Sequence, residues 1–405
     1  MDKITCAIKK QYNQFPYPSI PIGDLQDVFL YSTNYEFVNY LCTGVYKSAK
    51  NIKILDAGCG TGYSTLKLAQ QNPEAQIFAF DLSENSLKMA KERLEKAEVL
   101  SDQIHFFEAD LMNLPDLKQT FDYIVCTGVL HHTSSPELGI NNLSKYLKDD
   151  AIMYLMLYSE YGRFYLNQTR KAIKLLQSDQ EDLNEGMEIG KELFGSLNEN
   201  NPLFINYQRS YNASTKIISE DFADSEAQFI DSYVNAHERT YNIEQLFELL
   251  EKNNLHFLRF QDANNWDIKK IFRGNQKLID KCSYLSQKQK YQLGEIIFAE
   301  KNFAFFTAKI NFQKPIFSDE ELSKKKILVS KFNKLIQIDD EILITNPLGN
   351  GMQFTEESIV IYNALFDSGN ISDLIINFAK MFGMNYLQTL GFIRELESAC
   401  ILFFI

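Results

Sequence analysis

The chain has 405 residues, of which 45% are hydrophobic and 23% are charged, and its formal net charge is −12. This length predicts two or three domains, and the acidic balance argues against nucleic acid as a partner because phosphate binding requires a basic surface. We find no apolar run of transmembrane length and no signal-like N-terminus, and we therefore expect a cytoplasmic protein without an integral membrane segment.

A proline-rich aromatic segment dominates the N-terminus. Residues 11–21 read QYNQFPYPSIP, and three prolines within six residues argue against a helix there and favour an extended arm. Tyr12 and Tyr17 then predict either a lid that contacts a cofactor or an arm that only packs on the core. Residues 35–49 follow as an expected helix with one apolar side.

Residues 52–62, IKILDAGCGTG, predict a buried strand, a glycine turn and the start of a helix. Such a turn lets a ligand approach the backbone, and the helix N-terminus offers unpaired N–H groups. The pattern is not the dinucleotide motif, because Tyr63 stands where its last glycine would be. Asp56 would repel a pyrophosphate but suits a cofactor with a cationic amino group. The glycines of the turn are Gly58, Gly60 and Gly62.

Two further strands also lead into acids. Residues 76–81 end at Asp81, next to Leu82, where a carboxylate can accept hydrogen bonds from ribose hydroxyls. The following strand, near 103–108, leads to Asp110, where a carboxylate can accept from the amino group of adenine. Three strands that lead into carboxylates therefore predict a site for adenosine that carries an amino acid.

Strands and helices alternate from residue 52 to about 159, with further strands near 121–126 and 150–158. This alternation predicts an α/β fold with a doubly wound parallel sheet, whose ligands bind beyond the carboxyl ends of the strands. The three acids and the loop 127–132 belong to that edge, so we expect them to converge.

Four segments together resemble the class I methyltransferases that depend on S-adenosyl-L-methionine (SAM): ILDAGCGTG, the strand that ends in Asp81, EADLMNLP around Asp110, and FDYIVCTGVLHH at 121–132. The resemblance covers roughly residues 10–310. It implies SAM as the cofactor and a seven-stranded Rossmann-like sheet whose last strand is antiparallel. The cofactor-binding residues expected from the strands, the turn and the resemblance are Tyr12, Tyr17, Asp56, Gly58, Gly60, Gly62, Asp81, Leu82, Asp110, Leu111 and Thr127.

The block 160–240 interrupts the alternation and predicts a helical insertion, at the place where related enzymes carry substrate-specific elements. A helix at 242–252 and strands at 256–260 and 303–308 then complete the sheet. The segment 233–260 resembles a subgroup of bacterial, notably cyanobacterial, methyltransferases. This resemblance does not indicate a substrate. We therefore expect residues 1–312 to form the methyltransferase domain, with 1–50 as its N-terminal arm and helix.

Three histidines are candidates for catalysis. His131 and His132 follow the fourth strand, where a general base could take a proton from the acceptor; the alternative is that this loop only shapes the methionine end of the pocket. His237, in the run His-Glu-Arg, could lie over the acceptor or belong to a salt-bridged connector. The histidines show no metal-ligand spacing beyond the adjacent pair, and the six cysteines are scattered without C-x-x-C spacing, so we expect no metal site.

A charged linker at 313–326 precedes a small α+β unit at 327–405, with a hairpin around 346–351 and an apolar strand at 401–404. This unit resembles a winged helix. DNA binding is disfavoured because acids outnumber bases there, and packing, dimerisation or substrate docking is the preferred role.

The sequence thus predicts methyl transfer to a small-molecule or peptide acceptor. The aromatic, acidic composition favours an apolar or cationic acceptor, and a homodimer is compatible with the sequence. The alternatives are a non-catalytic SAM-fold scaffold and an oxidoreductase, which binding of SAM or of NAD would distinguish.

Overall fold

The structure is a computed structural model that describes the chain except residues 24–29, 331–332, 339–340, 347, 349–350 and 367–369. It contains two compact units. The first comprises Met1–Val28 and Lys50–Asn311, and the second comprises Phe29–Ala49 and Phe312–Ile405. In the described residues, no helix is long and apolar enough to span a membrane.

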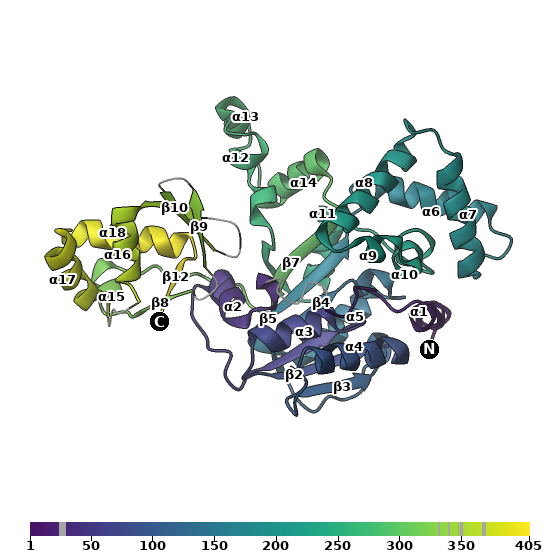
Figure 1. Cartoon of the computed structure of the whole chain (residues 1–405), viewed down its shortest axis with the longest axis horizontal. Coiled ribbons are helices and arrows are strands. Elements are labelled where there is room, and N and C mark those ends of the chain that lie inside the picture. Colours follow the sequence, from purple (N-terminus) through teal and green to yellow (C-terminus); the bar gives the residue numbers. More distant parts are fainter. Residues whose placement is uncertain (24–29, 331–332, 339–340, 347, 349–350, 367–369) are drawn as a thin grey trace. The chain divides into compact units, whose positions relative to one another are not determined.

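A seven-stranded sheet forms the centre of the first unit, in the order β3-β2-β1-β4-β5-β7-β6 (Figure 1). Its first five strands are mutually parallel, and β7 runs antiparallel to both neighbours. This arrangement confirms the predicted doubly wound sheet with an antiparallel last strand. The strands are β1 (Lys53–Ala57), β2 (Gln76–Asp81), β3 (Ile104–Glu108), β4 (Phe121–Thr127), β5 (Leu147–Tyr158), β6 (His256–Phe260) and β7 (Asn302–Ala308).

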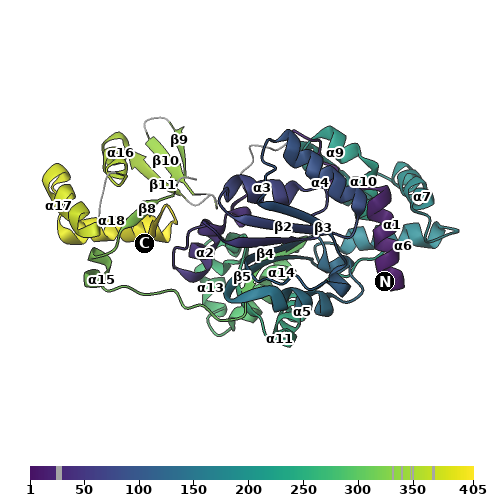
Figure 2. The ribbon, with the colours of Figure 1, turned by 90° about the horizontal axis from the view of Figure 1, so that it is seen from below.

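Helices cover both faces of this sheet, with α3 and α4 on one side and α5 and α11 on the other (Figure 2). Serines cap two of these helices at their N-termini: Ser83 accepts from the Ser86 N–H, and Ser135 accepts from the Leu138 N–H. The helices around the sheet are α3 (Tyr63–Gln71), α4 (Glu84–Lys96), α5 (Pro136–Tyr146), α11 (Ile243–Lys252), α12 (Ile268–Ile271), α13 (Gln276–Lys281) and α14 (Gln287–Phe298).

The N-terminal arm differs in part from the prediction, because α1 spans Lys3–Gln14. Asp2 caps this helix by accepting from the Thr5 N–H at 3.0 Å. The extended portion begins only after Gln14, since Pro16 restricts the backbone of Phe15 and nothing upstream. The helical residues at 11–14 were therefore wrongly expected to be extended.

The insertion is helical, as predicted, and has a hydrophobic core of its own around Ile173, Phe194 and Ile230. The helix α8 was not predicted individually, because it lacks a clear apolar stripe. None of its residues is buried. The elements are α6 (Phe164–Leu176), α7 (Leu183–Ser196), α8 (Pro202–Ile217), α9 (Glu220–Asp224), α10 (Glu226–Phe229) and a π-helical turn, Ile230–Val234.

The second unit contains a three-stranded antiparallel sheet and a short antiparallel pair, β8 with β12. The pairing of β10 with β11 agrees with the predicted hairpin, although residues 347 and 349–350 of its turn lie outside the described part. Its winged-helix character stays a prediction. The elements are α2 (Tyr35–Thr43), α15 (Asp319–Ser323), β8 (Ile327–Val329), β9 (Lys334–Ile338), β10 (Glu341–Thr345), β11 (Gly351–Thr355), α16 (Glu356–Asn363), α17 (Ile371–Phe382), α18 (Tyr386–Ser398) and β12 (Leu402–Phe404).

Helix α2 belongs to this second unit, whereas the sequence grouped residues 35–49 with the N-terminal arm. The buried Tyr40 hydroxyl donates to Glu397 Oε1 at 3.0 Å and accepts from the Phe404 N–H at 3.2 Å. Its ring lies 4.6 Å from that of Phe403. The helix ends at Thr43 and not at residue 49, because Gly44 adopts a left-handed conformation with φ 71°.

Gly62 provides a test of the packing between α3 and α4. It has φ 82°, and a Cβ placed on it would lie 2.6 Å from the Cβ of Ala90. We expect Gly62→Ala to lower the free energy of unfolding by about 2 to 4 kcal/mol, through backbone strain and overpacking, in urea denaturation.

The matched control is Gly195→Ala in α7, where a Cβ would have no neighbour within 4 Å. This control should leave stability unchanged or raise it by roughly 0.5 kcal/mol. Equal denaturation curves for the two variants would contradict this expectation and would show that α4 can shift to accommodate the added methyl group without loss of stability.

Candidate active site

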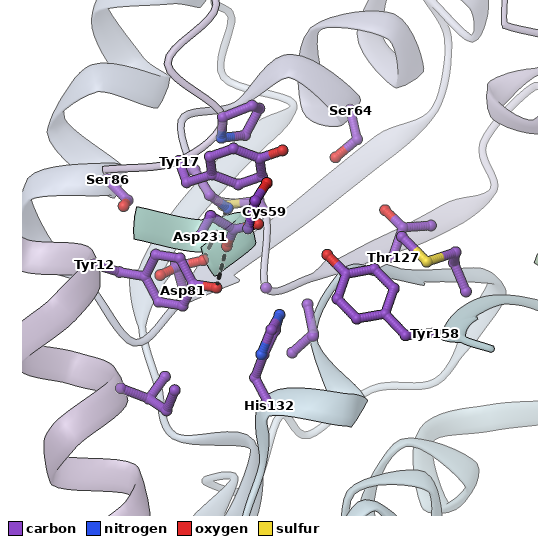
Figure 3. Close-up of a pocket in the computed structure, with 18 of the residues that line it drawn as sticks. Tyr12, Tyr17, Cys59, Ser64, Asp81, Ser86, Thr127, His132, Tyr158 and Asp231 are labelled. Atoms are coloured by element: carbon purple, nitrogen blue, oxygen red, sulfur yellow. Dashed lines mark hydrogen bonds between the residues drawn. The ribbon is translucent and has the colours of Figure 1, made fainter. Parts of the chain in front are cut away.

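A cavity of about 620 Å³ lies at the carboxyl edge of the parallel strands, a volume in the usual range for small-molecule sites. Its wall combines the N-terminal arm, the glycine turn, the ends of β2, β4 and β5, and the insertion (Figure 3). Most of the predicted cofactor residues line it. They are Tyr12, Tyr17, Gly58, Gly60, Asp81, Leu82, Asp110, Leu111 and Thr127.

Two acids are held at this edge by backbone N–H groups. Asp81 Oδ2 accepts from the Gly60 N–H and Oδ1 from the Ser83 N–H, each at 2.8 Å. Burial raises the pKa of Asp81, and these hydrogen bonds oppose that rise. Asp110 Oδ1 caps a short turn by accepting from the Met112 N–H at 2.9 Å. Since a carboxylate has about four acceptor positions, both side chains can still accept hydrogen bonds from a ligand.

Asp56 and Gly62 do not line the cavity, although the sequence predicted both as cofactor residues. The Asp56 carboxylate is buried and accepts from Ser64 Oγ and Thr65 Oγ1, both at 2.6 Å. Burial raises the pKa of Asp56 to about 6. It therefore ties β1 to the first turn of α3, and Gly62 serves the close packing of α3 on α4.

The N-terminal arm crosses the glycine turn. The Thr61 N–H donates to the Tyr17 carbonyl at 3.3 Å, and a Cβ on Gly60 would lie 2.4 Å from that oxygen. Arg93 is buried and donates to the carbonyls of Thr61, at 2.9 Å, and Ile20, at 2.6 Å. This clasp brings Tyr12 and Tyr17 into the cavity wall, which favours the lid interpretation over simple packing (Figure 3).

His132 points into the cavity between the rings of Tyr12 and Tyr158, whose centroids lie 6.2 Å and 5.5 Å away (Figure 3). Its Nδ1 lies 2.8 Å from the carbonyl oxygen of His237. Nε2 is buried and has no hydrogen-bond partner in the described residues. Burial lowers the pKa of His132, which keeps the ring neutral.

The other two candidate histidines do not line the cavity. His131 is fully buried and stacks on Tyr158 with a centroid distance of 3.6 Å, and burial lowers its pKa well below the usual value. His237 contributes its backbone carbonyl to His132, and its own ring stays outside the wall. Of the three histidines, the structure thus brings only His132 to the ligand space.

The insertion, β5 and the residue before β7 add a group of polar residues that the sequence did not predict for this site. Asp231, in the π-helical turn, accepts from the Tyr12 hydroxyl at 2.8 Å, and burial raises its pKa. Such a residue has no local sequence signal, because an irregular turn positions it. The cavity residues of this group are Tyr158, Arg163, Ser210, Asp231, Tyr233 and Lys301.

Glu238 holds two arginines behind this part of the wall. Arg163 reaches its two oxygens with Nε at 3.1 Å and Nη2 at 2.9 Å, and Arg170 Nη1 lies 2.7 Å from Oε1. The Arg163 guanidinium also lies over the ring of Tyr158, 3.5 Å from its centroid. The His-Glu-Arg run thus contains a salt-bridged residue, as one of the two interpretations predicted. That residue is Glu238, and its partners are Arg163 and Arg170.

Comparisons with known proteins point to methyltransferases. Residues 48–203 match the family described as a methyltransferase domain. An uncharacterized protein of Synechococcus sp. is 34% identical over 311 residues, which cover 76% of this chain and 72% of that protein. A malonyl-[acyl-carrier protein] O-methyltransferase of Bacillus cytotoxicus is 29% identical over 149 residues, or 37% of this chain and 49% of that protein.

The solved structure of PKMT2 from Rickettsia typhi in complex with AdoHcy shares the fold, with a TM-score of 0.61 at 18% identity. The alignment covers 93% of this chain and 77% of that chain. The matched domain contains the glycine turn and β1 to β5, and the similarity to the Synechococcus protein extends over most of both sequences. The chain therefore belongs to the class I SAM-dependent methyltransferases.

Proposed function

We propose that this methyltransferase methylates a hydroxyl group of a small-molecule or peptide acceptor, and that His132 takes the proton of that hydroxyl. One observation carries the proposal: Nε2 of His132 is buried, lies on a cavity-lining ring and has no partner in the described residues, while Nδ1 is engaged. The oxygen acceptor also agrees with the O-methyltransferase name of the Bacillus cytotoxicus relative.

The donor and acceptor groups at the strand ends suit SAM. Asp81 would accept from the ribose hydroxyls and Asp110 from the adenine amino group, while Gly58 and Gly60 leave room for close approach to the backbone. When bound, SAM would supply an electrophilic methyl group. The bond from that methyl group to the sulfur would break as its bond to the acceptor oxygen forms. The arm, with Tyr12 and Tyr17, would exclude water from this end of the cavity.

The hydrogen bond to His237 decides the protonation pattern of His132. A carbonyl oxygen can only accept, so Nδ1 must carry the proton and Nε2 presents a lone pair. A neutral imidazole whose free nitrogen faces the cavity has the form that a general base requires. The structure thus supports a proton transfer from the acceptor hydroxyl to Nε2 as the acceptor is methylated.

Asp231 would support the imidazolium that results from this transfer. Its charge raises the pKa of His132 and opposes part of the lowering that burial causes. The hydrogen bond from Tyr12 holds the Asp231 carboxylate in place at the wall. His132 would therefore act as the base, while Asp231 would be a positioning residue that stabilises the charge formed on it.

We expect His132→Asn to lower kcat by about 10² to 10⁴, because asparagine can keep a donor to the His237 carbonyl but cannot accept the proton. AdoHcy affinity, measured by calorimetry, should stay within a few-fold of the parent. The control His256→Asn changes an exposed histidine on β6 and should leave kcat unchanged. Full turnover in His132→Asn would exclude a base at this position.

The pH profile gives an independent check. A base whose pKa is lowered stays neutral until the pH falls through that lowered value, so kcat/KM should decline only below about pH 6.5, the ordinary histidine value. The limb assigned to His132 should disappear in His132→Asn. A decline centred above that value would point to another titrating group.

Asp81→Ala should weaken AdoHcy binding by about 10- to 100-fold, since it removes hydrogen bonds to a charged acceptor. The matched control Asp102→Ala changes an exposed acid in the segment that enters β3, at the opposite edge of the sheet, and should have no effect. Circular dichroism would establish that Asp81→Ala folds. Unchanged calorimetric affinity in a folded variant would remove Asp81 from the cofactor site.

A further inference from the structure

Two cationic side chains, from the insertion and from the residue before β7, line the same cavity. Arg163 is buried in the wall, and Lys301, directly before β7, is exposed at its rim. The Lys301 Nζ donates to Ser210 Oγ of α8 at 2.9 Å. Burial lowers the pKa of Lys301, and the charge of Arg163 lowers it further. The cavity wall therefore carries positive charge from two separate elements.

The acids in this region compensate only part of that charge. Glu238 is shared between Arg163 and Arg170, so a single carboxylate faces two guanidinium groups. Asp231 also lines the cavity, and its carboxylate accepts from the Tyr12 hydroxyl. Within the described part of the chain, no acid lies at ion-pair distance from Lys301. The Lys301 ammonium at the rim therefore has a hydroxyl partner, Ser210, but no acidic partner among the described residues.

The wall between this charge and His132 is aromatic. Tyr158 and Tyr233 are both buried and both line the cavity, and the Arg163 guanidinium covers the ring of Tyr158. An apolar or aromatic body would fit such a wall, while a cationic acceptor would meet uncompensated charge of its own sign. The net charge of −12 favours a cationic acceptor, but the local charge at the site has the opposite sign.

We propose that the acceptor is a hydroxy acid whose apolar body lies along Tyr158 and Tyr233. Its carboxylate ion-pairs with Lys301, and its hydroxyl lies at His132. This proposal rests on the proposed function for the position of the hydroxyl, but the carboxylate site stands on the cation cluster alone. Lys301 then acts as a specificity residue at the entrance, and Arg163 adds to the positive field behind it.

The test measures binding and not turnover. The AdoHcy-loaded protein is titrated, by saturation-transfer NMR and calorimetry, with hydroxybenzoates, hydroxycinnamates and aliphatic hydroxy acids of graded length, each beside its uncharged amide. We expect at least one acid to bind about tenfold more tightly than its amide. The preference should disappear in Lys301→Met and be kept in Lys301→Arg.

Lys252→Met is the matched control, because it removes the same charge from the exposed part of α11, outside the cavity. It should keep the full preference for acids. Equal binding of acids and amides, or no acid binding in the millimolar range, would overturn the proposal. So would a loss of AdoHcy affinity in Lys301→Met, which would assign the lysine to the carboxylate of the cofactor.

The two proposals fail separately. In His132→Asn the preference for acids over amides should persist even though turnover is lost, because the carboxylate site does not include the imidazole. Full turnover in that variant would contradict the role of His132 as the base. The carboxylate site at Lys301 would still be tested by the binding measurements. Loss of the acid preference in His132→Asn would instead place the carboxylate at the histidine and would overturn the role of Lys301.

Discussion

The part of the cavity proposed to hold the cofactor depends on how Asp81 is held. Its two oxygens accept from the Gly60 and Ser83 N–H groups, so one carboxylate joins the turn after β1 to the helix start after β2. The arm then lies against the same turn, where the Tyr17 carbonyl leaves no space for a Cβ on Gly60. Arg93 connects turn and arm from α4. A change at this carboxylate would therefore affect the cofactor edge and the lid together.

The part of the cavity proposed to hold the acceptor differs, because its polar groups come from irregular segments. The π-helical turn supplies Asp231, the short turn after β4 supplies His132, and the residue before β7 is Lys301. Asp231 and Lys301 line the same cavity as the imidazole of His132, and Lys301 has no acidic partner among the described residues. The net charge of the whole chain does not predict this local arrangement, since the field within a few ångströms is set by the nearest groups.

Sequence reasoning succeeded where function is coupled to regular structure. Asp81 and Asp110 follow strands whose period and length are visible in the sequence, and parallel strands bring their carboxyl ends to one edge. Local pattern does not show when a side chain near this edge turns to a different neighbour. Asp56 precedes the glycine turn, yet its carboxylate accepts from Ser64 and Thr65 and stays outside the cavity. His131 and His132 are adjacent, but only the second reaches the ligand space.

The sequence by itself predicted the parallel strands, the glycine turn and the acids at the strand ends, because these depend on local periodicity and on motifs of fixed spacing. Its resemblance to a known family implied the antiparallel last strand, and the role of the acids toward adenosine stays a proposal. Only the tertiary structure decided which histidine faces the cavity and that Asp231, Arg163 and Lys301 share its wall. It also showed that α2 packs with the C-terminal unit, through Tyr40, Glu397 and Phe404. The physical reason is that these contacts join residues remote in sequence, whose proximity depends on the packing of the insertion and of the second unit.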